Sequence, residues 1–69
     1  MHMSKDTTAV QALHKRLDRE FSPDAQDKIE WFEDRNTEEA YIWTFKADGI
    51  LWLLAYDYQT KRTRAARAS

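Results

Sequence analysis

Apolar residues in the first third of the chain recur with the period of an α-helix. Because they are spaced i, i+3, i+7 and i+11, they fall on one narrow stripe of a helix. The stripe consists of Val10, Leu13, Leu17 and Phe21. The pattern predicts a helix over residues 7–21, with Asp6 or Thr7 as its N-terminal cap. Ser22-Pro23 ends the helix, because the residue before a proline is pushed out of the α region.

The next segment, residues 23–34, fits two different structures. Ser22-Pro23-Asp24 is typical of a helix start, and a helix continuing to Asp34 would gather Ala25, Ile29 and Phe32 on one face. Alternatively, one helical turn over 23–26 precedes a strand over 28–33, because Ile29, Trp31 and Phe32 favour extended structure. We favour the strand, since a hairpin of two strands alone is marginal in water. Residues 34–38 are then expected to form a polar turn.

Asp48-Gly49 lies between two runs rich in aromatic and apolar residues, 41–47 and 50–58. Asp-Gly in this setting is the strongest short-range signal for a β-hairpin, because both central residues of a type I′ turn need positive φ. A two-residue turn also fixes which residues of the two strands pair and share a face. One face is then wholly apolar or aromatic and should receive the helix. Its residues are Tyr41, Trp43, Phe45, Ala47, Ile50, Trp52, Leu54 and Tyr56.

The opposite face of the hairpin also carries apolar residues, and no segment of the chain is left to cover it. We therefore predict an interface for a protein partner on this face. The predicted interface residues are Ile42, Thr44, Leu51, Leu53 and Ala55. The predicted fold class is α+β, with one N-terminal helix packed on a three-stranded antiparallel sheet and a basic C-terminal tail.

Composition is consistent with one small folded domain over residues 6–60. The 69 residues are 42% hydrophobic and include nine aromatic side chains, which is unlike a disordered chain. The absence of cysteine excludes a disulfide framework and thiolate metal sites. The longest apolar run, 50–56, is too short to span a bilayer, so we expect a soluble, cytoplasmic protein without membrane contact. Residues 1–5 are expected to be disordered, and Met1-His2-Met3 resembles an expression-vector remnant.

The net charge is only −1, but the two signs are separated along the chain. Nine acidic residues lie between Asp18 and Glu39, and no acid follows Asp57. The predicted tail, 61–69, carries four bases: Lys61, Arg62, Arg64 and Arg67. The tail is either a frayed end or a set of phosphate contacts. Tyr58 and Tyr56, at the strand end, are the aromatic residues most expected to be exposed, and Tyr58 could stack on an unpaired base.

No catalytic or cofactor motif accompanies these features. His14 and Asp18, one helical turn apart, are expected to form a boundary ion pair. Glu30, Glu33 and Asp34 lack the spacing of a calcium loop, so we expect a solvated acidic face. The sequence thus favours a non-catalytic regulatory module, without metal or cofactor, that binds a protein partner or forms a homodimer. The alternative is a nucleic-acid-binding protein that uses Tyr58 and the four bases of the tail.

Overall fold

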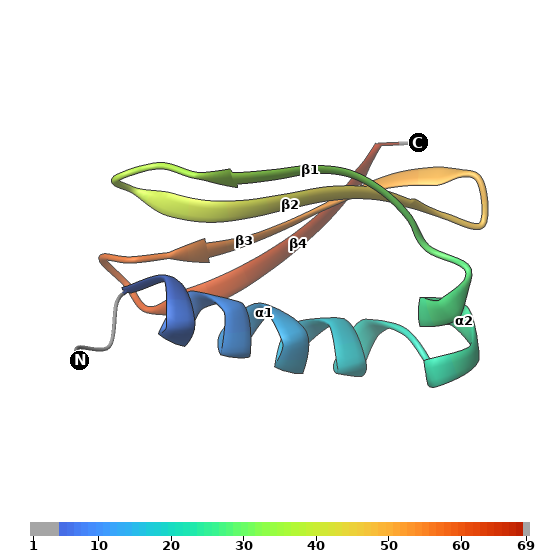
Figure 1. The fold of residues 1–69 in the computed structure, drawn as a ribbon, viewed down its shortest axis with the longest axis horizontal. Coiled ribbons are helices and arrows are strands. Elements are labelled where there is room, and N and C mark those ends of the chain that lie inside the picture. The colour runs from blue at the N-terminus through green and yellow to red at the C-terminus, as the bar shows by residue number, and fades with distance from the viewer. Residues whose placement is uncertain (1–4, 69) are drawn as a thin grey trace.

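The computed structural model of the chain describes the backbone of residues 5–68 and the side chains of residues 7–68. Six elements follow one another along the chain (Figure 1). They are α1 (Lys5–Glu20), α2 (Pro23–Asp27), β1 (Glu30–Asn36), β2 (Ala40–Ala47), β3 (Ile50–Asp57) and β4 (Arg62–Ala68). The strands form one antiparallel sheet in the order β1-β2-β3-β4, and α1 lies against one side of it. The predicted α+β class, with an N-terminal helix on an antiparallel sheet, is confirmed.

The core lies between α1 and the sheet, as the sequence predicted. Leu13 and Leu17 are buried on the helix, together with Ala9, while Val10 and Phe21 pack at the edge of the core. The sheet supplies Trp43, Phe45, Ala47, Leu54 and Tyr56. Phe21 meets Phe45 and Trp52 edge to face, with ring centroids 5.8 and 5.0 Å apart. Aromatic burial therefore supplies much of the packing in this short chain.

The ambiguous segment 23–34 contains a short helix followed by a strand. Ser22 caps α2, since its Oγ accepts a hydrogen bond from the Ala25 amide at 3.2 Å. β1 extends to Asn36, so the predicted limits of the strand (28–33) and of the turn (34–38) were wrong. The turn is formed by residues 37–39. Thr37 closes it, because its Oγ1 accepts hydrogen bonds from the amides of Glu39 and Ala40.

The central hairpin agrees with the prediction residue by residue. Asp48 and Gly49 have φ angles of 56° and 77°, as a type I′ turn requires. Phe45 pairs with Trp52, and Tyr41 pairs with Tyr56. The two faces of β2 and β3 therefore carry the residues that the sequence analysis assigned to them.

The prediction of three strands and a basic tail was wrong, because most of the predicted tail forms a fourth strand. Leu54 pairs with Ala65, and Asp57 pairs with Arg62. Alanine and arginine are strong helix formers, and alanine is depleted in strands, so local sequence did not indicate this strand. Pairing prevails because β3 would otherwise be an apolar edge strand, with its backbone groups unpaired. β4 supplies those partners and places an arginine-rich strand at the edge.

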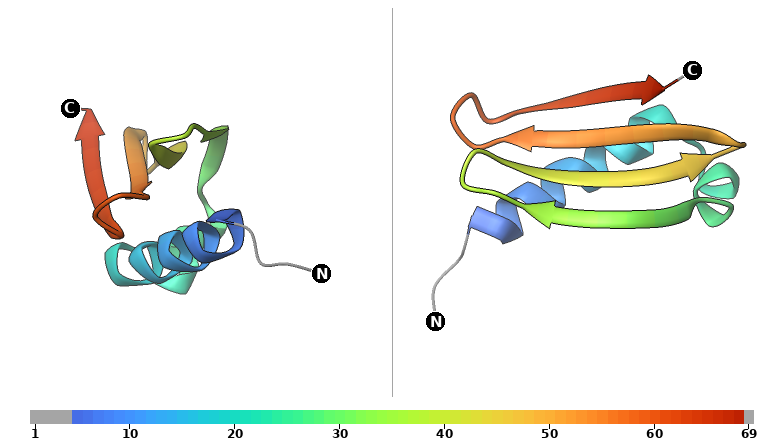
Figure 2. Two further views of the ribbon diagram at one scale, coloured as in Figure 1. Left: turned by 90° about the vertical axis from the view of Figure 1, so that its left-hand side faces the viewer. Right: turned by 90° about the horizontal axis from the view of Figure 1, so that it is seen from above.

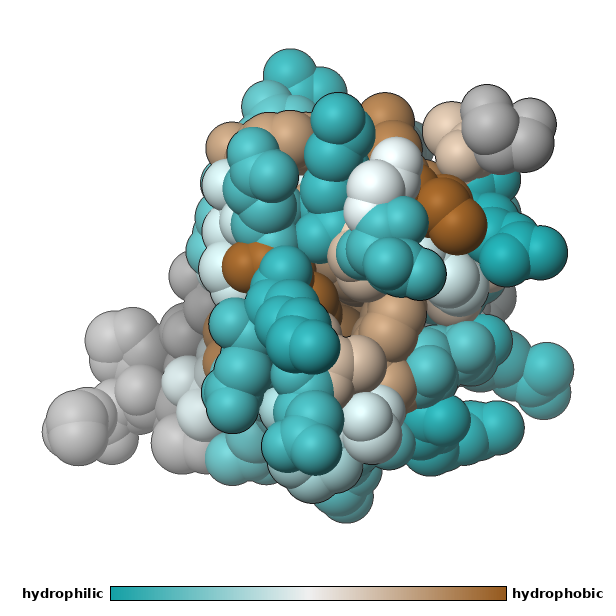
Figure 3. Space-filling view, turned by 90° about the vertical axis from the view of Figure 1, so that its right-hand side faces the viewer, coloured by the Kyte–Doolittle hydropathy of each residue, from teal (hydrophilic) through white to brown (hydrophobic). Residues whose placement is uncertain are grey.

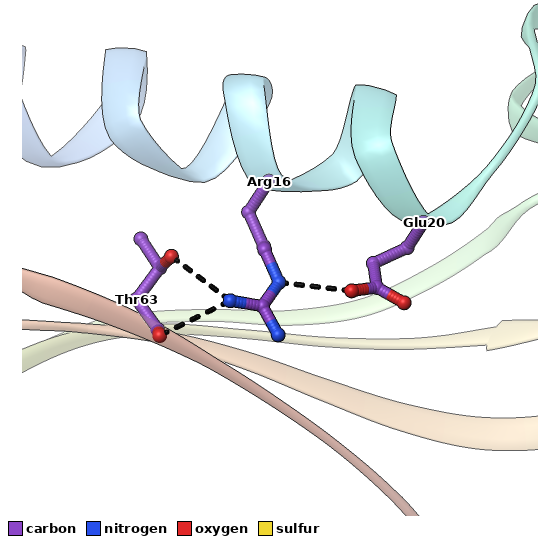
Figure 4. A network of polar contacts seen from close by, with 3 residues as sticks. All are labelled: Arg16, Glu20 and Thr63. Carbon is purple, nitrogen blue, oxygen red and sulfur yellow. Dashed lines mark hydrogen bonds and ion pairs between the residues drawn. The ribbon is translucent and has the colours of Figure 1, made fainter.

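Two sets of polar interactions hold β4 in place. The carboxylate of Asp57 accepts hydrogen bonds from the amides of Gln59 and Thr60, which closes the turn before β4. Arg16 on α1 donates to the Thr63 carbonyl oxygen at 3.3 Å and pairs with Glu20 at 2.9 Å (Figure 4). The helix is thereby tied to the last strand as well as to the hairpin.

Candidate interaction surface

The side of the sheet that faces away from α1 carries an apolar patch. Figure 2 shows this side with the helix behind it, and no other element of residues 5–68 lies over it. All five predicted interface residues lie here: Ile42, Thr44, Leu51, Leu53 and Ala55. β4 adds Ala66, which pairs with Leu53, and Ala68, which pairs with Leu51. These seven residues are called the open face below.

The open face has an apolar centre and a charged rim. Ala55 is buried, although no described element covers the face, because the longer side chains of Ile42 and Arg64 flank it across the sheet. Leu51 is 36% exposed, and Ile42 and Leu53 are half-buried. The rim carries both signs of charge, which come from Glu33, Arg35, Lys46 and Arg64. An apolar centre with a polar rim is the usual anatomy of a protein interface.

A shallow hollow of about 300 Å³ lies at one end of the open face. Its lining includes Leu51 and Leu53 from β3 and the small side chains of Ala66 and Ala68 from β4. Alanines beside leucines leave room for a side chain of a second surface. The uneven surface of the open face therefore suits contact with a second sheet, because side chains interdigitate where two sheets pack face to face.

The four bases of the predicted tail are spread over the molecule rather than gathered at its end. Arg64 lies at the rim of the open face, whereas Arg67 lies on the other side of β4, with its guanidinium 5.9 Å from the ring centroid of Trp52. Lys61 and Arg62 lie at the start of β4, close to α1. Tyr58 is half-buried, and its hydroxyl donates to the Asn36 side chain at 2.6 Å. The candidate nucleic-acid residues therefore do not form one continuous surface.

The most exposed aromatic side chains are on β1. Trp31 and Phe32 are each 51% exposed, whereas Tyr56, which was expected to be exposed, is 6% exposed and belongs to the core. α1 packs mainly against β3, β4 and β2 and has fewer contacts with β1, so β1 is the strand that the helix covers least. The register shift between Trp31 and Glu33 places an extra residue, Phe32, in the strand. The sequence offered no signal for such a bulge.

The predicted pair of His14 and Asp18 does not form. His14 packs edge to face against Trp43, with ring centroids 5.0 Å apart, and it lines a groove together with Trp31 and Asp34. Asp18 instead accepts a hydrogen bond from the Gln26 side chain at 2.9 Å, which ties α2 to α1. Each of the two residues thus contacts a partner other than the predicted one, an aromatic ring for His14 and a side-chain amide for Asp18.

Among the described residues there is neither a metal-ligand cluster nor a membrane-spanning helix. Across residues 7–68, whose side chains are described, no three histidine, aspartate or glutamate side chains are grouped closely enough to hold a metal ion. Within residues 5–68, neither helix is long and apolar enough to cross a membrane.

A hollow of about 530 Å³ between α2 and the β2–β3 turn is lined by Phe21, Ile50 and Trp52 among others. Figure 3 views this end of the molecule, where apolar surface emerges among hydrophilic side chains.

Comparison with known proteins assigns no family to this fold or surface. No protein-family model, curated protein or solved structure matches the chain.

Proposed function

We propose that this chain is a non-catalytic interaction module that acts through the open face, and that the occupant of this face is a second copy of the chain. The observation that carries the proposal is the uncovered apolar centre formed by β2, β3 and β4. Exposed apolar patches ringed by polar residues mark interaction sites in small domains.

The rim charges favour a second copy as the partner. A two-fold interface brings the same surface patch of both copies together, so that patch must complement itself. A rim of one sign would repel its own copy. Here Glu33 stands beside Arg35 on β1, and Lys46 and Arg64 lie farther along the rim, so each copy offers both signs to the other.

The size of the face predicts a weak dimer. Four strands spaced ~4.8 Å apart, with ~7 residues of ~3.3 Å each, give a face of roughly 450 Å² per copy. Two copies would then bury on the order of 900 Å² in total, which is the range of weak and transient complexes. We expect dissociation in the micromolar range rather than an obligate dimer.

Sedimentation equilibrium between 10 and about 500 µM tests the proposal. The unmodified chain should show a mass that rises with concentration towards that of a dimer. Leu53→Lys places a charge at the centre of the open face and should give a folded monomer. Ala66→Glu, at an exposed position of the same face, provides a second variant with less effect on folding.

Gln11→Lys is the matched control, because it adds the same charge at an exposed position on α1. It should dimerise like the unmodified chain. A folded, unmodified chain that sediments as a monomer at the highest concentration would overturn the proposal. Dimerisation that survives both Leu53→Lys and Ala66→Glu would place the interface elsewhere.

A further inference from the structure

The structure brings five basic residues from distant parts of the chain to one surface. Lys15, Arg16 and Arg19 lie on α1, and Lys61 and Arg62 lie where β4 begins. Together with Ala12 and Thr63 they line a single hollow of about 470 Å³. The five residues are called the basic cluster below. Its position is set by Arg16, whose bonds to Thr63 hold α1 against the start of β4.

Two acids that adjoin residues of the basic cluster are already engaged. Glu20 pairs with Arg16, and the Asp57 carboxylate accepts the amides of Gln59 and Thr60. Lys15, Arg19, Lys61 and Arg62 are exposed, which leaves four cations directed to solvent around one hollow. Like charges repel one another when they are gathered in this way, and a bound polyanion relieves that repulsion.

From this cluster we infer a second binding site, whose ligand is the phosphate backbone of nucleic acid. Lys15 and Arg19 stand one helical turn apart, and Lys61 and Arg62 face them across the hollow, so cations flank both sides of a short path. Among the described residues that line the hollow, only Ala12 is apolar, whereas a membrane-binding surface carries large apolar or aromatic groups beside its bases.

The site should not distinguish base sequence. No aromatic side chain lines the hollow, and the most exposed aromatic residues, Trp31 and Phe32, lie on β1 at the other edge of the sheet. Without a ring for stacking, binding depends on phosphates alone. We therefore expect duplex and single-stranded nucleic acid of mixed sequence to bind with similar, modest affinity.

Fluorescence polarisation with a labelled 20-base-pair DNA duplex and with one of its strands tests the inference. Binding should be measurable near 20 mM salt. The slope of log affinity against log salt should lie between about −3 and −4 for the duplex, since each neutralised phosphate contributes about −0.9. Lys15→Glu/Arg19→Glu should weaken binding at least tenfold.

A matched control separates the basic cluster from overall charge. Lys28→Glu/Arg67→Glu changes the net charge by the same amount at exposed positions outside the cluster and outside the open face, and it should change affinity less than twofold. Lys61→Asn/Arg62→Gln provides a second test on β4, because asparagine tolerates the φ of 61° found at Lys61. Circular dichroism should show that all variants remain folded.

Three results would overturn the inference. The first is no binding to either nucleic acid at 20 mM salt. The second is an equal loss of binding in the cluster variant and in the control. The third is binding to vesicles containing anionic phospholipid without binding to nucleic acid, which would identify the ligand as a lipid surface.

Discussion

At the scale of single residues, the charged carboxylate of Asp57 stabilises the β3–β4 turn. Hydrogen bonds from the amides of Thr60 and Gln59, with a smaller effect of the nearby Arg64 charge, hold the pKa of Asp57 below its ordinary value of 3.8. Because the pKa is lower in the folded chain, the stabilising effect is complete above the unfolded pKa. It is lost as pH falls through the folded pKa.

Asp57→Ala should therefore lower the thermal midpoint at pH 7, because two turn amides lose their acceptor. The difference between variant and unmodified chain should shrink as pH falls below about 3.8. Thermal unfolding followed by circular dichroism from pH 7 to 2.5 measures this. Glu38→Ala, an exposed change in the β1–β2 turn, serves as the control. A difference that stays constant over the whole range would show that the charge of Asp57 is not involved.

The β2–β3 turn gives a second prediction at the same scale. A Cβ atom added at Gly49 would meet no atom within 4 Å, so Gly49→Ala tests backbone strain alone at a φ of +77°. We expect a loss of about 1–2 kcal/mol in unfolding free energy, the cost of a left-handed conformation for alanine. Asp48→Asn keeps a residue that tolerates this region and should change stability by less than about 0.5 kcal/mol. Urea unfolding of both variants measures these changes in unfolding free energy.

At the scale of elements, a helix or strand could be predicted from the sequence where its signal lies among residues that are neighbours in the chain. Asp48-Gly49 specified the β2–β3 hairpin and its register, because the turn and its flanking residues are adjacent in the chain. The stripe from Val10 to Phe21 likewise indicated a helix through the spacing of its own residues alone. β4 gave no such signal, since Ala65, Ala66 and Arg67 favour helix or coil when taken alone. Its structure is imposed by the unpaired edge of β3.

Removing residues 61–69 is therefore expected to unfold or aggregate the chain, because the removed residues include a strand of the sheet and are not a free tail. The truncation would leave the apolar strand β3 as an exposed edge and would remove the Thr63 oxygen that Arg16 binds. Size-exclusion chromatography and circular dichroism of the truncated chain measure the outcome. Arg67→Ala, a single change within β4, is the control for loss of charge. A truncated chain that stays monomeric and unfolds cooperatively would contradict this account of β4.

At the scale of the whole molecule, one candidate surface could be predicted from sequence and the other could not. The open face followed from the alternation of β2 and β3, although the contribution of Ala66 and Ala68 depended on the unforeseen strand. The basic cluster combines Lys15 and Arg19 with Lys61 and Arg62, which are more than forty positions away in the chain. Helical periodicity predicts which residues share one face of a helix. It does not predict which strand will lie beside that face.

The last prediction couples self-association to the stability of the whole molecule. If the open face pairs two copies, the folded state is favoured by concentration, whereas unfolded chains do not pair. Above the dissociation constant, a tenfold rise in concentration contributes up to about 0.7 kcal/mol per chain, which shifts the thermal midpoint of a domain of this size by roughly 3–5 °C. Scanning calorimetry at 20, 200 and about 1000 µM should show this rise for the unmodified chain and for Gln11→Lys. Leu53→Lys should unfold at one midpoint throughout. A midpoint of the unmodified chain that does not depend on concentration would show that the open face does not pair two copies.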